Sequence, residues 1–261
     1  MKVVVKRLNI EFRQGLKEFW TEFQLPWSQQ HENIITLVGY CDERKEDIIV
    51  YEYAKRGSLD QYIRCENTNY TLTWPERLKI VVDIARGLDH LHNHLQNNQV
   101  IIHGDIKSSN ILLDHRWIAK ISDLGLSKLT FSDFEDTRAV ISLPVGRHII
   151  VEMEQEYGLV TQKTDVYSFG MVLFEVLCGR LSYIKDKDGI MLTEKLAKEH
   201  YSKDQLDRII DPAIRGQMSP NSLRKYSAIA YKCLHVREQR PRMDVVKREL
   251  EETLNIEVRN F

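Results

Sequence analysis

The residues with the clearest chemical potential lie in the segment IIHGDIKSSNILLD, positions 101–114. Asp105 follows a histidine by two places, and Lys107 and Asn110 come two and five places later. In phosphoryl transfer a carboxylate can accept the proton of an attacking hydroxyl, while an amide and a second carboxylate hold metal ions. Asp123 supplies the second carboxylate, and Lys107 can neutralise charge on the transferring group. The same side chains could instead only satisfy the amides of a turn, so the loop alone leaves both interpretations open.

Length and composition limit the class of protein. The 261 residues are 43% hydrophobic and 29% charged, which is enough to bury the core of one large domain or two small lobes. A net charge of −1 gives no field that would favour nucleic acid or an anionic membrane. Four cysteines without CxxC spacing predict neither a zinc site nor a disulfide framework, as in a reducing cytosol. No apolar run approaches the ~18–20 residues of a membrane span. We therefore expect a soluble intracellular protein with no nucleic-acid partner.

Hydrophobic periodicity predicts a strand-rich head followed by a helical body. Short β-branched runs predict strands over residues 2–8, 35–40 and 47–53. Residues 14–25 have helical spacing, and Pro26 should end or kink that helix. Further helices are predicted over residues 73–95, 164–178, 193–199, 203–210, 222–234 and 242–256.

The HGDIKSSN loop has a rigid neighbour on each side. The long helix 73–95 precedes it, and a β-hairpin is predicted over residues 111–122 with its turn at Asp114–Arg116. Residues 124–162 carry few periodic signals, which for so long a connection indicates a functional loop. The change from strands to helices implies two lobes, and residues 52–56 are the natural crossing between them.

Lys6 stands alone on the apolar strand VVVKRL, where it needs a partner if it faces inward, and Glu22 is the candidate. With this pair added to the Asp–Asn loop, the sequence resembles the protein kinases, and most closely the plant receptor-like (RLK/Pelle) serine/threonine group. The stretches that carry the resemblance run in family order from residue 3 to about 250: VVVKRL, HENIITLVGYCDE, IVYEYAKRGSLDQYI, HGDIKSSNILLD, ISDLGLSK, KTDVYSFGMVLFEVLCGR and QRPRM.

The resemblance implies an α+β, bilobal protein-kinase-like fold in one kinase domain over residues 1–261. A truncated β-rich small lobe (1–54) would join a large, mainly helical lobe (55–261) through a hinge at 52–56. The implied activity is ATP-dependent transfer of the γ-phosphate to Ser/Thr hydroxyls in signalling, with ATP and Mg²⁺ as cofactors. Protein substrates are the implied partners, together with a co-receptor or another kinase. The implied location is cytoplasmic, at the plasma membrane if the chain is part of a longer receptor.

The resemblance also assigns catalytic roles residue by residue. Asp105 would be the catalytic base with Lys107 beside it, and this lysine is the pattern of serine/threonine rather than tyrosine kinases. Asn110 and Asp123 would ligate Mg²⁺. Asp165 would brace the catalytic loop from below, although a helix-start aspartate would stand at the same position.

A second set of residues would hold the nucleotide. Lys6 would contact the α- and β-phosphates of ATP and pair with Glu22. Tyr51 would be the gatekeeper beside the adenine. Glu52 and Ala54 would offer hinge backbone groups to it, and Leu112 would pack beneath the ring.

Four departures from the family pattern matter, and one of them is Pro26, which stands four residues after Glu22 where the family packs a large apolar residue. The Gly-rich loop that should precede Lys6 is not in this sequence, so we expect no backbone lid over the phosphates. Gly104 stands where the family has an arginine that pairs with an activation-loop phosphate. Residues 142–154 read SLPVGRHIIVEME, without the usual Pro-Glu anchor. The alternative is a pseudokinase that acts as a scaffold or allosteric partner of an active kinase, and an unrelated structural α/β protein is a third reading.

Overall fold

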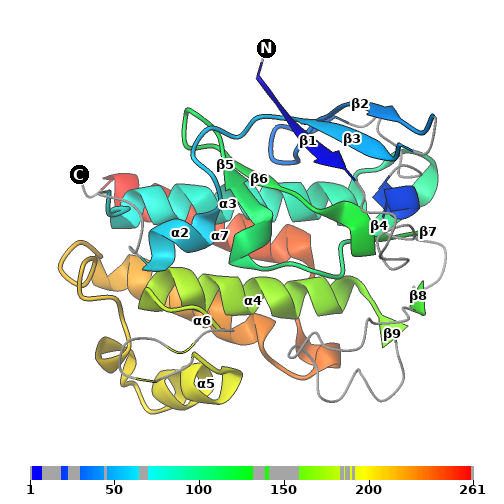
Figure 1. Cartoon of the computed structure of the whole chain (residues 1–261). Coiled ribbons are helices and arrows are strands. Elements are labelled where there is room, and N and C mark those ends of the chain that lie inside the picture. Colours follow the sequence, from blue (N-terminus) through cyan, green and yellow to red (C-terminus); the bar gives the residue numbers. More distant parts are fainter. Residues whose placement is uncertain are drawn as a thin grey trace.

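A computed structural model describes residues 2–7, 19–22, 30–43, 46–64, 70–131, 139–140, 159–182, 185, 189 and 192–259. A small antiparallel sheet lies at one end of a larger body of helices (Figure 1). The predicted α+β class and the bilobal arrangement are therefore confirmed. Among the described residues, no helix is long and apolar enough to cross a membrane.

The small sheet contains the three strands that the sequence predicts. Strands β1 (Val3–Arg7), β2 (Leu37–Cys41) and β3 (Ile48–Glu52) pair in the order β1-β3-β2, and both pairings are antiparallel. In the register of β1 with β3, Lys6 lies opposite Ile49, which is buried. Of the helix predicted over 14–25, residues 19–22 are helical and the remainder lies outside the described residues.

The larger body is built mainly from helices. In the described part of the chain they are α2 (Leu59–Arg64), α3 (Trp74–Asn93), α4 (Gln162–Cys178), α5 (Glu194–Ser202), α6 (Pro220–Cys233) and α7 (Met243–Arg259). The helix predicted over 203–210 is wrong, because this stretch contains only the short 3₁₀ turn η4 (Leu206–Arg208). Asp204 has a positive φ of 54°, and residues 202–208 present no buried face that could stabilise a helix.

Helix α3 is the central support of the body. Its start is fixed by a capping arrangement in which the Glu76 carboxylate accepts a hydrogen bond from the Thr73 amide at 2.8 Å. Apolar residues recur at helical spacing along its buried side, including Leu78, Val81 and Leu88. This side packs against α7 and against the strands that flank the candidate site.

The predicted hairpin over 111–122 is present as β5 (Ile111–Leu113) paired with β6 (Ala119–Ile121). The Asp114 carboxylate closes its turn by accepting hydrogen bonds from the amides of Arg116 (2.7 Å) and Ile118 (2.9 Å). The hairpin therefore forms a short, rigid support directly behind the HGDIKSSN loop.

A second strand pair was not predicted. Strand β4 (Gln99–Ile102) pairs antiparallel with β7 (Lys128–Phe131), which lies inside the stretch 124–162 that the sequence predicts as a loop. Each strand has four residues, too few for a period-2 pattern to be recognised. Within the same stretch, β8 (Ala139–Val140) pairs with β9 (Leu159–Val160), and residues 141–158 lie outside the described part.

The small sheet is tied to the body by the segment that leads into β2. The Ile35 amide donates to the Ile121 carbonyl (2.8 Å), and the Ile121 amide donates to the Asn33 carbonyl (2.9 Å). Gly87 of α3 faces this junction, where a Cβ would lie 2.7 Å from the Asn33 carbonyl oxygen, so only glycine permits the close approach. The junction aligns the two halves of the candidate site.

Candidate active site

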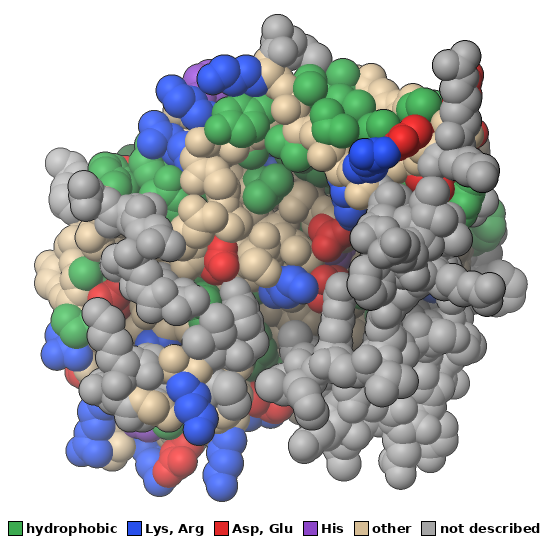
Figure 2. All heavy atoms as spheres, in the orientation of Figure 1, with side chains coloured by type: hydrophobic (Ala, Val, Ile, Leu, Met, Phe, Trp, Pro, Cys, Tyr) green, Lys and Arg blue, Asp and Glu red, His purple; other side chains and the backbone are tan. Residues whose placement is uncertain are grey.

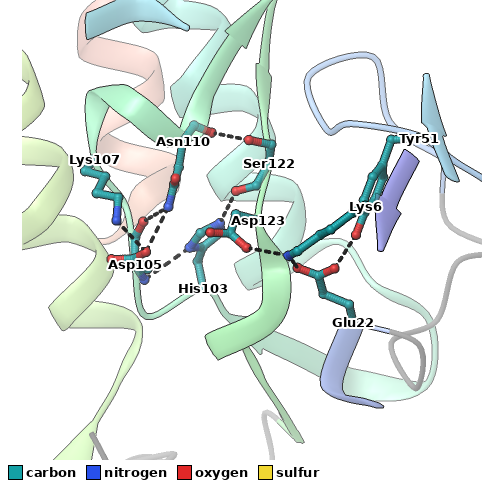
Figure 3. Close-up of polar contacts among 9 residues, drawn as sticks. All are labelled: Lys6, Glu22, Tyr51, His103, Asp105, Lys107, Asn110, Ser122 and Asp123. Atoms are coloured by element: carbon teal, nitrogen blue, oxygen red, sulfur yellow. Dashed lines mark hydrogen bonds and ion pairs between the residues drawn. The ribbon is translucent and has the colours of Figure 1, made fainter. Parts of the chain in front are cut away.

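Acidic and basic side chains gather in a hollow near the middle of one face of the molecule (Figure 2). The residues predicted to do chemistry lie in two groups (Figure 3). One group surrounds Asp105 between β4 and β5, and the other surrounds Lys6 of β1. Asp123, two residues after the end of β6, lies between the two groups and contacts the second one.

Asp105 is at the centre of the first group. Its Oδ2 accepts a hydrogen bond from Lys107 Nζ at 2.8 Å and one from Asn110 Nδ2 at 2.9 Å. Asn110 Nδ2 also donates to the Asp105 carbonyl at 2.8 Å, which closes the loop on itself. The three side chains that the sequence places within six positions therefore meet in space, with one carboxylate oxygen receiving both donors.

The backbone of this loop is held by the buried carboxylate of Asp165, in the first turn of α4. Asp165 Oδ2 accepts from the His103 amide and Oδ1 accepts from the Gly104 amide, both at 2.8 Å. His92 of α3 contacts the same Oδ2 through Nε2 at 2.9 Å. Three elements thus converge on one buried charge, and its hydrogen bonds offset the cost of burying it.

The conformation of Gly104 gives a local reason for its residue type. Its φ is +77°, in the left-handed region that L-residues adopt only at a cost. Its amide must also point at Asp165 to complete the anchor. Glycine reaches this conformation without strain, and it leaves no side chain next to Asp105.

His103 connects the loop to the strand end that carries Asp123. Its ring is fully buried; Nδ1 accepts from the Asp105 amide at 3.2 Å, and Nε2 lies 3.1 Å from the Ser122 carbonyl. An accepting Nδ1 requires the proton on Nε2, which then donates to Ser122. The Ser122 hydroxyl in turn donates to the Asn110 carbonyl at 2.9 Å. A neutral histidine with one defined tautomer therefore fixes the spacing between Asp105 and Asp123.

Lys6 is at the centre of the second group. Its Nζ lies 2.8 Å from Glu22 Oε1 and 3.2 Å from Asp123 Oδ1. The hydroxyl of Tyr51 donates to Glu22 Oε2, so each oxygen of this buried carboxylate has a donor. Lys6 is half exposed, with 48% of its side chain accessible, whereas Glu22 is fully buried.

Burial and charge act in opposite directions on these groups. Burial alone would lower the pKa of Lys6, but the negative charges of Glu22 and Asp123 outweigh it and raise the pKa above its usual value. Burial raises the pKa of Glu22 in spite of the Lys6 charge. Burial also acts to raise the pKa of Asp123, but the Lys6 charge and hydrogen bonds leave it lowered. Asp123 is therefore held as a carboxylate that faces the cleft.

The predicted hinge residues lie at the end of β3. The Glu52 amide donates to the Thr36 carbonyl (3.0 Å), and the Ala54 carbonyl accepts from the Gly57 amide (3.3 Å). The Glu52 carboxylate has a role that the sequence did not indicate, because it contacts Lys120 Nζ at 3.0 Å and accepts from the Thr36 amide at 2.8 Å. Burial would raise the pKa of Glu52, but these hydrogen bonds leave it lowered.

Leu112 occupies the middle of β5. The strand has the burial pattern buried, intermediate, buried, so Leu112 points to the opposite side from Ile111 and Leu113. It also bridges Ser58, which follows the predicted hinge. The roles predicted for Tyr51, Ala54 and Leu112 stay predictions, because the structure fixes only their positions.

Two residues of the site were not identified from the sequence. His92 lies on the buried side of α3, fourteen positions after Leu78 and four after Leu88, and a polar residue at a buried helical position needs a partner. The helical spacing of His92 could therefore have identified it from the sequence. Ser122 gave no signal, because its partner depends on how β6 packs. Residues 142–154, where the sequence lacks the usual Pro-Glu anchor, lie outside the described residues.

The donors present suit a hard divalent cation. Asn110 uses its amide nitrogen on Asp105, which leaves Oδ1 as the oxygen available for a metal, and Asp123 adds a carboxylate. No group of three or more His, Cys, Asp or Glu that could hold an ion by itself occurs in the described ranges. One or two protein oxygens combined with substrate phosphates are what Mg²⁺ commonly uses. The residues thus fit Mg²⁺ bound together with a nucleotide.

Comparisons with known proteins all match this chain to protein kinases. Residues 1–250 match the model of the family described as protein tyrosine and serine/threonine kinase. The chain is 40% identical over 238 residues to receptor-like protein kinase HERK 1 and 38% identical over 263 residues to receptor-like protein kinase FERONIA, both of Arabidopsis thaliana. These alignments cover 89% and 98% of this chain. The chain spans 28% of the length of each of the two relatives.

Proposed function

We propose that this chain, which belongs to the protein tyrosine and serine/threonine kinase family, is an ATP-dependent protein serine/threonine kinase of the plant receptor-like group. The observation that carries the proposal is the position of Lys6 Nζ, 2.8 Å from Glu22 and 3.2 Å from Asp123. Asp123 is 117 positions away from Lys6 in the chain, so this contact brings the small sheet and the large body to one phosphate-binding point.

The proposed mechanism assigns proton transfer to Asp105. Its Oδ2 accepts from Lys107 and Asn110, which hold the carboxylate in place, and this carboxylate would accept the proton of a substrate serine or threonine hydroxyl. Lys107, 31% exposed, can stabilise negative charge on the phosphoryl group as it moves. Asn110 and Asp123 would hold Mg²⁺, which when bound supplies positive charge against the phosphates of the nucleotide.

The small lobe would position the nucleotide. Lys6 is oriented by Glu22, which is itself fixed by Tyr51, so its ammonium is preorganised for the α- and β-phosphates. We further propose a hinge at residues 52–56 between a small lobe (1–54) and a large lobe (55–261). Leu112 would pack beneath the adenine, with backbone groups of Glu52 and Ala54 beside it.

The wider setting is also a proposal. The relatives that the chain matches are receptor-like kinases, and we propose protein substrates in signalling for this chain, with a co-receptor or another kinase as a partner. We propose a cytoplasmic location, at the plasma membrane if the chain is part of a longer receptor.

The direct test is transfer of radiolabelled phosphate from ATP to casein. We expect incorporation on Ser and Thr with the native chain, and its loss in Asp105→Asn. Glu238→Gln, the same charge change at an exposed position on the turn η5 (Arg237–Gln239) of the helical body, is the matched control and should keep the native rate. Saturable Mg²⁺–ATP binding without any transfer would contradict the kinase proposal and favour a pseudokinase scaffold.

A further inference from the structure

Trp117 lies in the turn between β5 and β6 in a conformation that bulky residues rarely adopt. Its φ is +67°, and the residues that follow it enter β6 directly. Neighbouring side chains from three parts of the large body surround its ring. Tyr62 of α2 meets it edge-on at 5.2 Å between centroids, and Tyr70, before α3, stacks on it at 4.8 Å. An unfavourable backbone conformation held by so many contacts suggests a role for the ring.

The third neighbour is Arg56, at the end of the proposed hinge. The centre of its guanidinium lies 3.8 Å from the centroid of the Trp117 ring, within the range of a cation–π contact. Its Nη2 donates to the His115 carbonyl at 3.3 Å, and its Nε is buried with no hydrogen-bond partner in the described part of the chain. The ring of Trp117 and a carbonyl of the β5–β6 turn therefore both contact the guanidinium.

The backbone around Arg56 is paired with the strand that carries Leu112. The Arg56 amide donates to the Leu113 carbonyl at 3.0 Å, and the Leu113 amide donates to the Gly57 carbonyl at 2.8 Å. Ser58 completes the contact by an antiparallel bridge to Leu112. The Tyr62 hydroxyl also donates to the Arg56 carbonyl at 3.0 Å. The contact of Arg56 with Trp117 thus lies at one end of the pairing between residues 56–58 and β5, the strand that carries Leu112.

We propose that Arg56 and Trp117 are positioning residues that set the separation between the hinge and Leu112, and so set the affinity for the nucleotide. This inference rests on the proposed function. Neither residue has to touch the nucleotide, because both act through the backbone pairing of residues 56–58 with β5. Their contacts run to the hinge and the hairpin and not to Asp105, so nucleotide affinity should change while the rate at saturating ATP does not.

The test compares Arg56→Lys and Trp117→Leu with the double variant. Lysine keeps the charge but lacks the planar group that stacks on an aromatic ring. We expect each single variant to raise the Kd for Mg²⁺–ATP and the KM for ATP about fivefold or more, with kcat within about twofold. Because the residues act as one pair, the double variant should be no weaker than the worse single variant.

Two further variants serve as controls. Trp117→Phe keeps an aromatic ring and should restore near-native affinity. Arg116→Gln removes the neighbouring charge of the same turn, which is 61% exposed and makes only contacts of 3.5 Å to Glu32 and 3.6 Å to Asp114, and should change nothing. If Trp117→Leu does not fold, Arg56→Lys with the ring in place decides the question.

The outcomes separate the two proposals. A native Kd and KM in Arg56→Lys, or kcat that falls in parallel with affinity, would overturn the positioning role and leave the proposed function intact. Native protein that binds no Mg²⁺–ATP would overturn the proposed function, and this inference with it.

Discussion

The two halves of the candidate site are built in different ways. Around Asp105, short side chains and backbone groups within eight positions of the chain contact one another, and the buried Asp165 anchors their backbone. Around Lys6, a long and half-exposed side chain reaches two carboxylates that come from distant parts of the sequence. The first half is fixed by local chain geometry and a buried anchor, whereas the second depends on how the small sheet sits on the body.

Under the proposed function, the two halves suit two different tasks, proton acceptance and the binding of phosphates. A loop that is rigid before substrate arrives suits proton acceptance, which needs fixed geometry. A charge network that spans two lobes suits the binding of a polyanion, because its strength follows the approach of the lobes. The pair that joins the two halves, Lys6 and Asp123, is separated by 3.2 Å, and both side chains are partly exposed.

The largest expected effect comes from removing the proposed base, Asp105, in the local half. Asp105→Asn keeps the size of the side chain but cannot accept the substrate proton, so kcat should fall by about 10² or more. The side chain is only 16% exposed and lies 2.8 Å from Lys107 Nζ, so a smaller loss in the free energy of unfolding should accompany the loss of rate. Steady-state kinetics with a peptide substrate, alongside urea unfolding, measures both. Retention of the full rate would show that another group accepts the proton.

A buried carboxylate behind the same half should respond to pH. Asp83 of α3 accepts a hydrogen bond from the Ala119 amide at 3.2 Å, and burial raises its pKa from 3.8 to about 6. Between those values the folded protein holds a proton that the unfolded chain has lost, so the free energy of unfolding falls as pH rises through this window. The full difference corresponds to about 3 kcal/mol as an upper bound.

Asp83→Asn removes that cost while keeping an acceptor for Ala119. The variant should be more stable than the native protein near pH ~7.5, and the advantage should disappear near pH ~3.5. Urea unfolding at the two pH values tests the sign. An advantage that is the same at both would mean that packing, and not ionisation, explains it.

Gly104 tests the backbone of the local half. Gly104→Arg would restore the residue that the family has here, but it must adopt φ +77°, at a cost of about 1–2 kcal/mol. We expect a lower midpoint of thermal unfolding and transfer that still depends on Asp105. Gly104→Asn, which tolerates the left-handed region better, should lose less. Equal stability of all three proteins would show that the loop relaxes.

The smallest effect is expected at the edge of the network in the small lobe. Tyr51→Phe removes the hydroxyl that donates to Glu22 but leaves the contact of Glu22 with Lys6. The loss of one donor to a buried carboxylate should raise the KM for ATP a few-fold, with kcat unchanged. A kinetic comparison at limiting and saturating ATP would detect it. A loss of kcat instead would place Tyr51 in the chemical step.

The same local and long-range distinction explains what the sequence could predict. The three strands of the small sheet and helix α3 followed from residue patterns within each segment, and so did the hairpin β5–β6. The β4–β7 pair did not, because each short strand is defined only by its partner. Residues 203–210 have the residue pattern of a helix, but Asp204 has a positive φ and no side chain of residues 203–208 is fully buried.

Within the site, residue type predicted some contacts and not others. A lysine alone on an apolar strand required a partner, and Glu22 lies 2.8 Å from it. The second donor to Glu22, from Tyr51, depends on the packing of β3 and had no sequence signal. The sequence likewise did not explain why residue 104 is a glycine, because its positive φ is a property of the folded loop.

The division of labour between the two halves is tested most directly by calorimetric titration of Mg²⁺–ATP into Asp105→Asn and Lys6→Met, with phosphate transfer measured on the same samples. We expect Asp105→Asn to bind Mg²⁺–ATP with the native Kd while losing transfer by about 10² or more. Lys6→Met should bind at least about tenfold more weakly. Native binding by Lys6→Met, or a loss of binding in Asp105→Asn, would contradict the account.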